Sequence, residues 1–123
     1  MANILLVEDD MMIREAFTII LDLDQHHITT AENGQIGIKL CHDTTFDLIL
    51  LDIMMPVMDG VGFLKEYTAN YHDVATKVIL MSNLSSGTEL SMVKKYGVQK
   101  VVLKSSLTPT VLLKTVKQVL EKS

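Results

Sequence analysis

One cysteine, two prolines and six glycines are all that the 123-residue sequence contains of the residues that cross-link or interrupt a fold. The lone cysteine, Cys41, cannot form an internal disulfide, which is consistent with a reducing compartment. With so little Pro and Gly, and no low-complexity run or internal repeat, the sequence shows no linker and no disordered tail. Because 48% of the residues are hydrophobic, we expect residues 1–123 to form one domain with its own core.

The sequence also lacks a basic cluster and a long apolar run. Its net charge is −4 and its lysines are dispersed, whereas direct nucleic-acid binding requires clustered Lys and Arg. The N-terminus has no basic stretch followed by a cleavage site, and the longest apolar run is interrupted by Asp52 and too short to span a bilayer. These absences predict a cytoplasmic protein that binds neither nucleic acid nor a membrane directly.

What the sequence does contain is a regular alternation of apolar patterns. Four continuous runs rich in Ile, Val and Leu are typical of parallel strands buried on both faces, and a more polar fifth run, HITTA (27–31), suits an edge strand. Between the runs, apolar residues repeat at helical spacing. Five strands that alternate with five helices predict an α/β fold, with a parallel sheet between layers of helices. The four apolar runs are NILLV (3–7), DLILL (47–51), KVILM (77–81) and KVVL (100–103).

Polar side chains occur where the predicted strands end. Glu8 and Asp9 follow the first strand, and Asp52, Ser82 and Lys104 end the third, fourth and fifth. Because parallel strands bring their C-terminal ends to one edge of the sheet, these side chains are expected to converge. Three carboxylates provide oxygen ligands for a hard divalent cation, and a hydroxyl with an ammonium group suits a phosphoryl group.

Other residues have structural explanations. Thr108 followed by Pro109 is typical of a helix start, Asp59 is predicted to cap a helix, and Asp10 to support the first turn of another. Gly60 is predicted to take a positive φ, and the methionines after Asp52 are predicted to pack in the core and loop. Four histidines lack metal-ligand spacing and are predicted to lie at the surface. They are His26, His27, His42 and His72.

Four motifs resemble the receiver domain of bacterial two-component response regulators. The resemblance covers essentially the whole chain, and the segment from Asp52 to Gly60 is its most specific part. It implies a chemotaxis-type, flavodoxin-like (βα)5 three-layer sandwich with the strand order 2-1-3-4-5. It also implies a phosphoacceptor regulatory domain that assists its own phosphorylation and dephosphorylation, and no conventional enzyme. The motifs are VEDD (7–10), DLILLDIMMPVMDG (47–60), MS (81–82) and VLKS (102–105).

The resemblance implies a metal-dependent phosphorelay centred on Asp52. This residue would accept a phosphoryl group from a phosphohistidine on a sensor histidine kinase or a histidine phosphotransfer protein. Mg²⁺ is the implied cofactor, with Asp9, Asp52 and the backbone carbonyl of Met54 as ligands and Glu8 acting mainly through a bound water. These oxygen ligands fit the preference of Mg²⁺, which keeps several waters and takes one or two carboxylates.

The remaining implied roles concern the phosphoryl oxygens and the output. Lys104 would supply a compact positive charge to those oxygens and Ser82 one hydrogen bond. The phosphorylated form would act on a downstream protein or an effector domain. Because the chain ends soon after its fifth predicted helix, we expect a stand-alone receiver; a fragment of a longer regulator is the alternative.

Two positions depart from the family pattern. The family usually has an aromatic residue three positions before the lysine, where it turns inward on phosphorylation, but this chain has Val101. Switching is therefore expected to move the backbone near Ser82 to Ser86 and the helix from about Gly87 to Tyr96, without a large side-chain change at position 101. Ser105 stands where the family commonly has a proline after a cis peptide bond, and a trans bond is expected here because a non-proline cis bond costs about 3 kcal/mol.

Dephosphorylation is expected to be slow. In the resembled family, the residues two positions after the phosphoacceptor and two after the Ser or Thr flank the path of the attacking water; here they are Met54 and Leu84. Neither side chain orients a water by hydrogen bonding, and both exclude water by bulk. In the opposing hypothesis, Asn83 orients the water itself or holds the site open.

Three other classes of protein are alternatives to this interpretation. A flavin protein of the same fold needs hydroxyls and glycines after the first strand, where acids would repel its phosphate. An aspartyl-phosphate hydrolase places a second acid two residues after its nucleophile, where this chain has Met54. A pseudo-receiver, which mediates interactions without taking a phosphoryl group, remains the alternative, although all five site residues are present.

Overall fold

The structure is a computed structural model and describes residues 2–71, 76–83 and 87–122. Five parallel strands form one sheet in the order β2-β1-β3-β4-β5, which confirms the predicted α/β class and the topology that the resemblance implied. The strands are β1 (Asn3–Val7), β2 (His27–Ala31), β3 (Leu48–Asp52), β4 (Lys77–Ser82) and β5 (Lys100–Leu103). The helices are α1 (Met11–Leu23), α2 (Gly34–Asp43), α3 (Gly60–Tyr71), α4 (Gly87–Lys95) and α5 (Pro109–Glu121).

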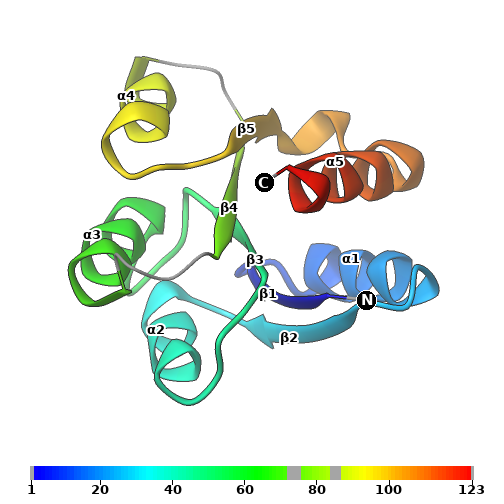
Figure 1. Cartoon of the computed structure of the whole chain (residues 1–123), viewed down its shortest axis with the longest axis horizontal. Helices are drawn as coiled ribbons and strands as arrows, with labels where there is room; N and C mark the ends of the chain where they lie inside the picture. The colour runs from blue at the N-terminus through cyan, green and yellow to red at the C-terminus, as the bar shows by residue number, and fades with distance from the viewer. Residues whose placement is uncertain (1, 72–75, 84–86, 123) are drawn as a thin grey trace.

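Helices cover both faces of the sheet: α1 and α5 lie on one face, and α2, α3 and α4 on the other (Figure 1). Side chains alternate between these faces along β1. Leu5 and Val7 belong to the apolar cluster that includes residues of α2 and α3, whereas Ile4 and Leu6 belong to the cluster that includes residues of α1 and α5. A strand covered on both faces needs apolar residues at every position, which explains the continuous apolar runs.

Central and edge strands differ in burial. Every residue of β3 is buried, while β2 pairs only with β1 within the described part of the chain and is partly exposed, as predicted for an edge strand. The prediction that KVVL is buried on both faces is wrong. This strand, β5, pairs only with β4 among the described residues, and Leu103 is 36% exposed. The run is apolar because Val101 packs against one apolar cluster and Val102 against the other, and an apolar run does not reveal how many neighbours a strand has.

Helix starts follow the capping residues predicted from the sequence. The Asp10 carboxylate accepts hydrogen bonds from the backbone N–H groups of the first turn of α1 at 2.9 and 3.1 Å. Asp59 accepts one from the N–H of Gly62 at 2.8 Å, and Thr108 accepts one from the N–H of Val111 at 3.3 Å. These bonds satisfy N–H groups that have no partner within the helix. No helix within the described ranges is long and apolar enough to cross a bilayer.

Gly60 is required for a different reason than the predicted positive φ. Among the described glycines only Gly97 has a positive φ, so the prediction is wrong. A Cβ atom at Gly60 would lie 2.7 Å from the Cα of Ile53 and 2.9 Å from the carbonyl oxygen of Asp52. The start of α3 therefore lies directly against the backbone that carries Asp52, and only a glycine permits this approach.

Cys41 and the histidines differ in burial. Cys41 is buried in α2. His27 and His42 are exposed, but the surface prediction is wrong for His26. Its side chain is 9% exposed and its Nδ1 accepts a hydrogen bond from the N–H of Ala2 at 3.2 Å. A ring nitrogen that satisfies a backbone donor explains this burial. His72 lies outside the described residues.

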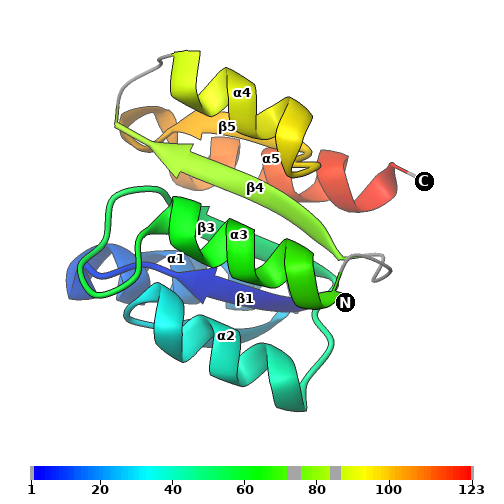
Figure 2. The same cartoon turned by 90° about the vertical axis from the view of Figure 1, so that its left-hand side faces the viewer.

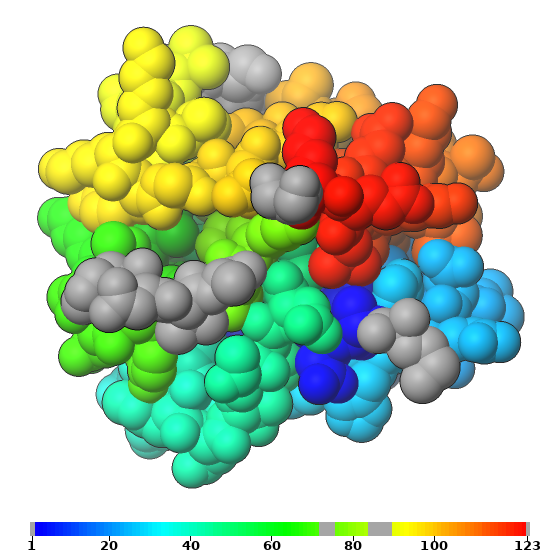
Figure 3. Space-filling view, viewed as in Figure 1, coloured from blue at the N-terminus to red at the C-terminus, as the bar shows by residue number. Residues whose placement is uncertain are grey.

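Both ends of the described chain lie on one face of the molecule (Figures 1 and 3), near the edge where the strands begin. At this edge the ammonium group of Lys77, at the start of β4, donates hydrogen bonds to the carbonyl oxygens of Leu120, at 3.2 Å, and Lys122. These carbonyls lie at the C-terminus of α5, where a cation is favoured by the helix dipole. The acidic residues Glu8, Asp9 and Asp52 lie at the opposite edge, where the strands end.

Candidate functional site

All five strands run in the same direction, so their C-terminal ends meet at one edge (Figure 2). Glu8 and Asp9 directly follow β1, Asp52 ends β3, and Ser82 ends β4. Lys104 begins a short 3-10 turn directly after β5. Glu8, Asp52 and Ser82 are buried, whereas Asp9 is exposed. The topology thus brings to one edge the five residues predicted to converge there.

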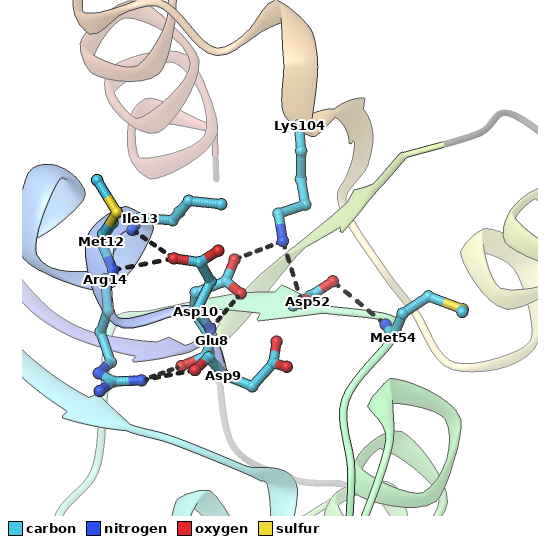
Figure 4. Close-up of polar contacts among 9 residues, drawn as sticks. All are labelled: Glu8, Asp9, Asp10, Met12, Ile13, Arg14, Asp52, Met54 and Lys104. Carbon is cyan, nitrogen blue, oxygen red and sulfur yellow. Dashed lines mark hydrogen bonds and ion pairs between the residues drawn. The ribbon is translucent and has the colours of Figure 1, made fainter.

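Three carboxylates form the centre of this edge. One oxygen each of Glu8, Asp9 and Asp52 lies within 4.8 Å of the other two. Figure 4 shows these three side chains together with Lys104. Like charges at this separation repel one another, so the arrangement is costly unless a cation compensates for it. An all-oxygen set of this kind suits Mg²⁺ or Ca²⁺ and does not suit metals that prefer sulfur or imidazole.

Lys104 compensates for part of the negative charge. Its Nζ lies 2.7 Å from Oε1 of Glu8 and 3.2 Å from Oδ2 of Asp52. Burial lowers the pKa of the Lys104 ammonium, but the hydrogen bond and charge of Glu8 and the charge of Asp52 outweigh burial and raise the pKa. The ammonium therefore stays charged between two carboxylates.

The peptide bond from Lys104 to Ser105 is trans, as predicted, since the described residues contain no cis peptide.

Glu8 is the most deeply buried of the three acids. Its Oε2 accepts a hydrogen bond from the N–H of Asp10 at 3.1 Å. The pKa of the Glu8 carboxyl is raised from 4.5 to about 7, mainly by burial and to a smaller extent by the charge of Asp52, against the opposing effects of Lys104 and the Asp10 N–H. Within the described part of the chain, no donor is well aligned with Oε1, whose contact with Lys104 is an ion pair. This oxygen thus has capacity for a further ligand.

Asp52 lies at the base of an open cavity. Its side chain is almost fully buried, and its Oδ1 accepts a hydrogen bond from the N–H of Met54 at 3.2 Å. The cavity is about 420 Å³ and is lined in part by Asp9, Asp52, Met54, Asn83 and Lys104. The Met54 side chain is 72% exposed. Met54 thus lies in the surface loop after β3 and flanks the cavity, without packing in the core.

The other predicted site residues lie further from the carboxylates or outside the described ranges. Val101 is half-buried in β5 and packs against the apolar cluster that includes α2 and α3. Leu84, predicted to control dephosphorylation, lies outside the described residues. The expected roles of Val101 and Leu84 therefore stay predictions.

A further residue at this edge, Arg14, was not predicted from the sequence. Its Nη1 donates hydrogen bonds to the backbone carbonyl oxygens of Glu8, at 2.8 Å, and Asp9, at 3.2 Å (Figure 4). Arg14 is the only arginine in the sequence and follows the acids by one turn of α1. This position in the sequence indicates the contact, because a long cationic side chain in the first turn of a helix reaches the loop that precedes the helix.

Comparisons with known proteins agree with this geometry. A family profile described as "Response regulator receiver domain" matches residues 4–117. Protein PilH of Pseudomonas aeruginosa is 31% identical over 120 residues, which cover 98% of each chain. The solved structure of chemotaxis protein CheY4 of Vibrio cholerae has a TM-score of 0.88 at 28% identity, over 97% of this chain and 98% of CheY4.

The similar solved structures include a complex with Mg²⁺-BeF. The response regulator TrrA of Thermotoga maritima, in complex with Mg²⁺-BeF, has a TM-score of 0.81 at 31% identity, over 97% of this chain and 99% of TrrA. Several other curated relatives are longer proteins, and the match spans only 27% to 51% of their lengths. The similarity to those longer proteins thus concerns one part of each.

Proposed function

Because the chain belongs to the response regulator receiver domain family, we propose that it is the phosphoacceptor of a two-component phosphorelay and that Asp52 receives the phosphoryl group. The observation that carries this proposal is the convergence of three carboxylates within 4.8 Å, with Lys104 paired to two of them. A regulatory domain of this kind controls another protein or domain and is no conventional enzyme, although it assists its own phosphorylation and dephosphorylation. Residues 1–123 form the proposed domain.

The chemistry assigned to Asp52 is nucleophilic attack. An oxygen of its carboxylate attacks the phosphorus of a phosphohistidine, and the bond from phosphorus to nitrogen breaks with its electron pair left on the imidazole. Such transfers depend mostly on positioning and on stabilisation of charge on the phosphoryl oxygens. Lys104, 3.2 Å from Asp52, is placed to supply positive charge, and the hydroxyl of Ser82 is assigned one hydrogen bond to the same oxygens.

The residues present fit the Mg²⁺ that the family implies. Asp9, Asp52 and the carbonyl oxygen of Met54 are the proposed ligands, with Glu8 acting mainly through a bound water. The buried Oε1 of Glu8, which has an ion pair with Lys104 but no well-aligned hydrogen-bond donor in the described structure, supports this assignment, and so does the all-oxygen donor set. When bound, Mg²⁺ neutralises negative charge on the carboxylates and on the phosphoryl oxygens.

The proposed partners follow from this chemistry. A sensor histidine kinase or a histidine phosphotransfer protein supplies the phosphoryl group, and a downstream protein or effector domain receives the output. Exposed apolar side chains near the acidic edge, Met11, Met12 and Met54, offer contact area to such a donor protein. The negative net charge and dispersed lysines support a domain without direct nucleic-acid or membrane contact, and we propose that it acts in the cytoplasm.

The test is Mg²⁺-dependent labelling by a small phosphodonor such as acetyl phosphate, followed by intact mass. Wild type is expected to gain one phosphoryl group with Mg²⁺ and none with a chelator, and Asp52→Asn is expected to gain none. Asp59→Asn is the matched control, because asparagine caps a helix as well as aspartate does. Full labelling of Asp52→Asn would contradict the assignment. A wild type that takes no phosphoryl group from either a small donor or a phosphorylated histidine protein would be the pseudo-receiver.

We further propose that the phosphorylated form decays slowly. Met54 lines the cavity over Asp52, and a thioether accepts hydrogen bonds too weakly to orient the attacking water. Met54→Asn is therefore expected to accelerate decay about tenfold, which is less than the roughly 10²–10⁴-fold typical of a positioned general acid or base, because an amide orients the water without taking its proton. Phosphoprotein remaining after removal of the donor is measured by intact mass over time, for wild type, Met54→Asn and Met54→Leu. Met54→Leu is expected to decay as slowly as wild type, and decay of Met54→Asn no faster than that of Met54→Leu would contradict the role of Met54 and favour Asn83 as the orienting group.

A further inference from the structure

Arg14 binds the backbone of the same residues whose side chains form the acidic cluster. Its half-buried side chain comes from α1, and one nitrogen, Nη1, contacts the carbonyl oxygens of both Glu8 and Asp9, at 2.8 and 3.2 Å (Figure 4). Hydrogen bonds from a charged donor are about twice as strong as neutral ones. Arg14, the only arginine of the sequence, thus contacts the backbone of the loop that carries Glu8 and Asp9.

The loop from Glu8 to Asp10 is held from several directions, and Arg14 supplies the contacts to its carbonyls. The N–H of Glu8 donates to the carbonyl oxygen of Ala31 at the end of β2, at 3.0 Å. The N–H of Asp10 donates to the Glu8 carboxylate at 3.1 Å. Without Arg14, nothing in the described structure bonds the carbonyls of Glu8 and Asp9, and rotation of these two peptide groups would redirect both carboxylates.

The backbone of Arg14 is itself held by two hydrogen bonds. Its N–H donates to the carbonyl oxygen of Asp10 at 2.9 Å within the first turn of α1, and its own carbonyl accepts from the hydroxyl of Thr18 at 2.7 Å. The guanidinium is planar and always charged, and its donors have a fixed geometry that a lysine ammonium lacks. The position therefore suits a group that sets direction rather than one that only adds charge.

We propose that Arg14 is a positioning residue for the cation site: it fixes the directions of the Glu8 and Asp9 carboxylates through their backbone carbonyls and does not contact the ion. This inference rests on the proposed function. A positioning role and a purely electrostatic role of Arg14 predict opposite effects on cation binding when the side chain is replaced. The charge of Arg14 alone opposes the binding of a cation, so its removal would strengthen binding, whereas loss of its hydrogen bonds frees the loop and weakens binding.

Two substitutions separate these effects. Arg14→Lys keeps the positive charge and loses the fixed geometry, and Arg14→Gln loses the charge and keeps a short amide donor. Lys39→Gln is the matched control, because it removes one exposed charge from α2. The dissociation constant of Mg²⁺ is measured by calorimetric titration of each folded protein, and the free energy of unfolding without Mg²⁺ by urea denaturation. The second measurement shows that every variant is folded during the first.

Both Arg14 variants are expected to bind Mg²⁺ about tenfold more weakly than wild type, as is typical for groups that orient metal ligands, and Lys39→Gln is expected to bind equally. Unchanged binding in Arg14→Lys together with tighter binding in Arg14→Gln would overturn the proposal, since charge alone would explain it. Equal binding by all variants would overturn it too. If wild type itself fails to bind Mg²⁺, the proposed function fails with it, which distinguishes the two failures.

The single arginine permits a direct check on the contact. In a sample labelled with ¹⁵N-arginine, the side-chain signals come from Arg14 alone. A guanidinium held by two carbonyls is expected to exchange its protons with water about tenfold more slowly than a free one, and its signal is expected to move on addition of Mg²⁺ with the same midpoint as the calorimetric titration. Rapid exchange with and without Mg²⁺ would show that the contact is not formed in solution, and the proposal would fall.

Discussion

Val57, in the loop after Asp52, has a backbone φ of 68°. This left-handed region costs a residue other than glycine about 1–2 kcal/mol, and β-branched residues tolerate it poorly. The side chain is 77% exposed, so packing does not offset the strain. We predict that Val57→Asn raises the free energy of unfolding by about 1 kcal/mol, because asparagine adopts this conformation more readily. Urea denaturation without Mg²⁺ measures the change.

Val57→Ala is the control for this prediction. Alanine lacks the branch but keeps a Cβ atom, so its gain is expected to be smaller than that of asparagine. An equal gain in both variants would show that the exposed valine side chain, and not the backbone conformation, is the source of the cost. Strain of this kind is common in loops next to functional sites, and this loop joins Asp52 to α3.

Side chains that act through their own charge were predictable from the sequence, and groups that act through the backbone were not. Glu8, Asp52 and Lys104 stand where apolar runs end, and parallel strands must bring those ends together. Arg14 bonds carbonyl groups, which every residue carries, so no pattern of residue types marks its partners. The close approach at Gly60 likewise depends on two segments whose distance apart appears only in the folded chain.

At the scale of elements, the pattern of apolar residues predicted all five strands and all five helices, because buried strands and amphipathic helices leave different periods in a sequence. Capping residues such as Asp10 and Thr108 also predicted where helices begin. What the pattern did not predict is the position of β5 at an edge. Both β5 and the central strands are apolar runs in the sequence. In the described structure β5 differs from the central strands because it pairs with one neighbour, β4.

Switching is expected to involve β4 and α4 rather than a side-chain flip in β5. Val101 has no ring to move between exposed and buried positions and is already half-buried against the core. We predict that Mg²⁺ with beryllofluoride, a phosphoryl mimic, shifts the backbone amide signals of Ser82, Asn83 and α4 by NMR, while the methyl signals of Val101 change little. The predicted region also includes residues 84–86, which lie outside the described structure.

A Val101→Tyr variant shows whether an aromatic side chain would restore the family's usual coupling. Its ring signals are expected to shift on addition of the mimic, because a tyrosine has a ring that can be buried or exposed. The Val101→Leu variant is the matched apolar control and is expected to behave as wild type does. Amide shifts confined to Asp9, Asp52 and their neighbours in wild type, with α4 unmoved, would contradict the predicted route.

The whole molecule places opposite charge arrangements at the two edges of its sheet. At the edge where strands begin, the Lys77 ammonium meets carbonyl oxygens at the C-terminus of α5, a favourable pairing. At the edge where strands end, three carboxylates meet with one lysine between two of them. Repulsion among the carboxylates lowers stability, and a site that needs this repulsion in order to bind a cation must carry the cost in its metal-free state.

Asp9 is the residue with which this trade-off can be measured. It belongs to the carboxylate cluster, is exposed, and has no ion pair with Lys104 in the described structure. Asp9→Asn therefore removes repulsion without breaking an attraction. We predict that it raises the free energy of unfolding of the metal-free protein by about 1 kcal/mol, the size of one interaction between charges near 4 Å in water. Urea denaturation in a chelator measures this change.

The same substitution is expected to abolish most of the stabilisation by Mg²⁺. A ligand at a hundredfold excess over its dissociation constant stabilises the folded state by about 2.7 kcal/mol, so Mg²⁺ should make wild type the more stable protein although Asp9→Asn is the more stable one without it. Asp22→Asn removes an exposed acid elsewhere on α1 and controls for net charge; it is expected to keep the full effect of Mg²⁺. If Asp9→Asn is destabilised in the chelator, the three carboxylates do not repel one another enough to matter. If Mg²⁺ stabilises Asp9→Asn as strongly as wild type, Asp9 is not a ligand, and the cation must be held by Glu8 and Asp52 without it.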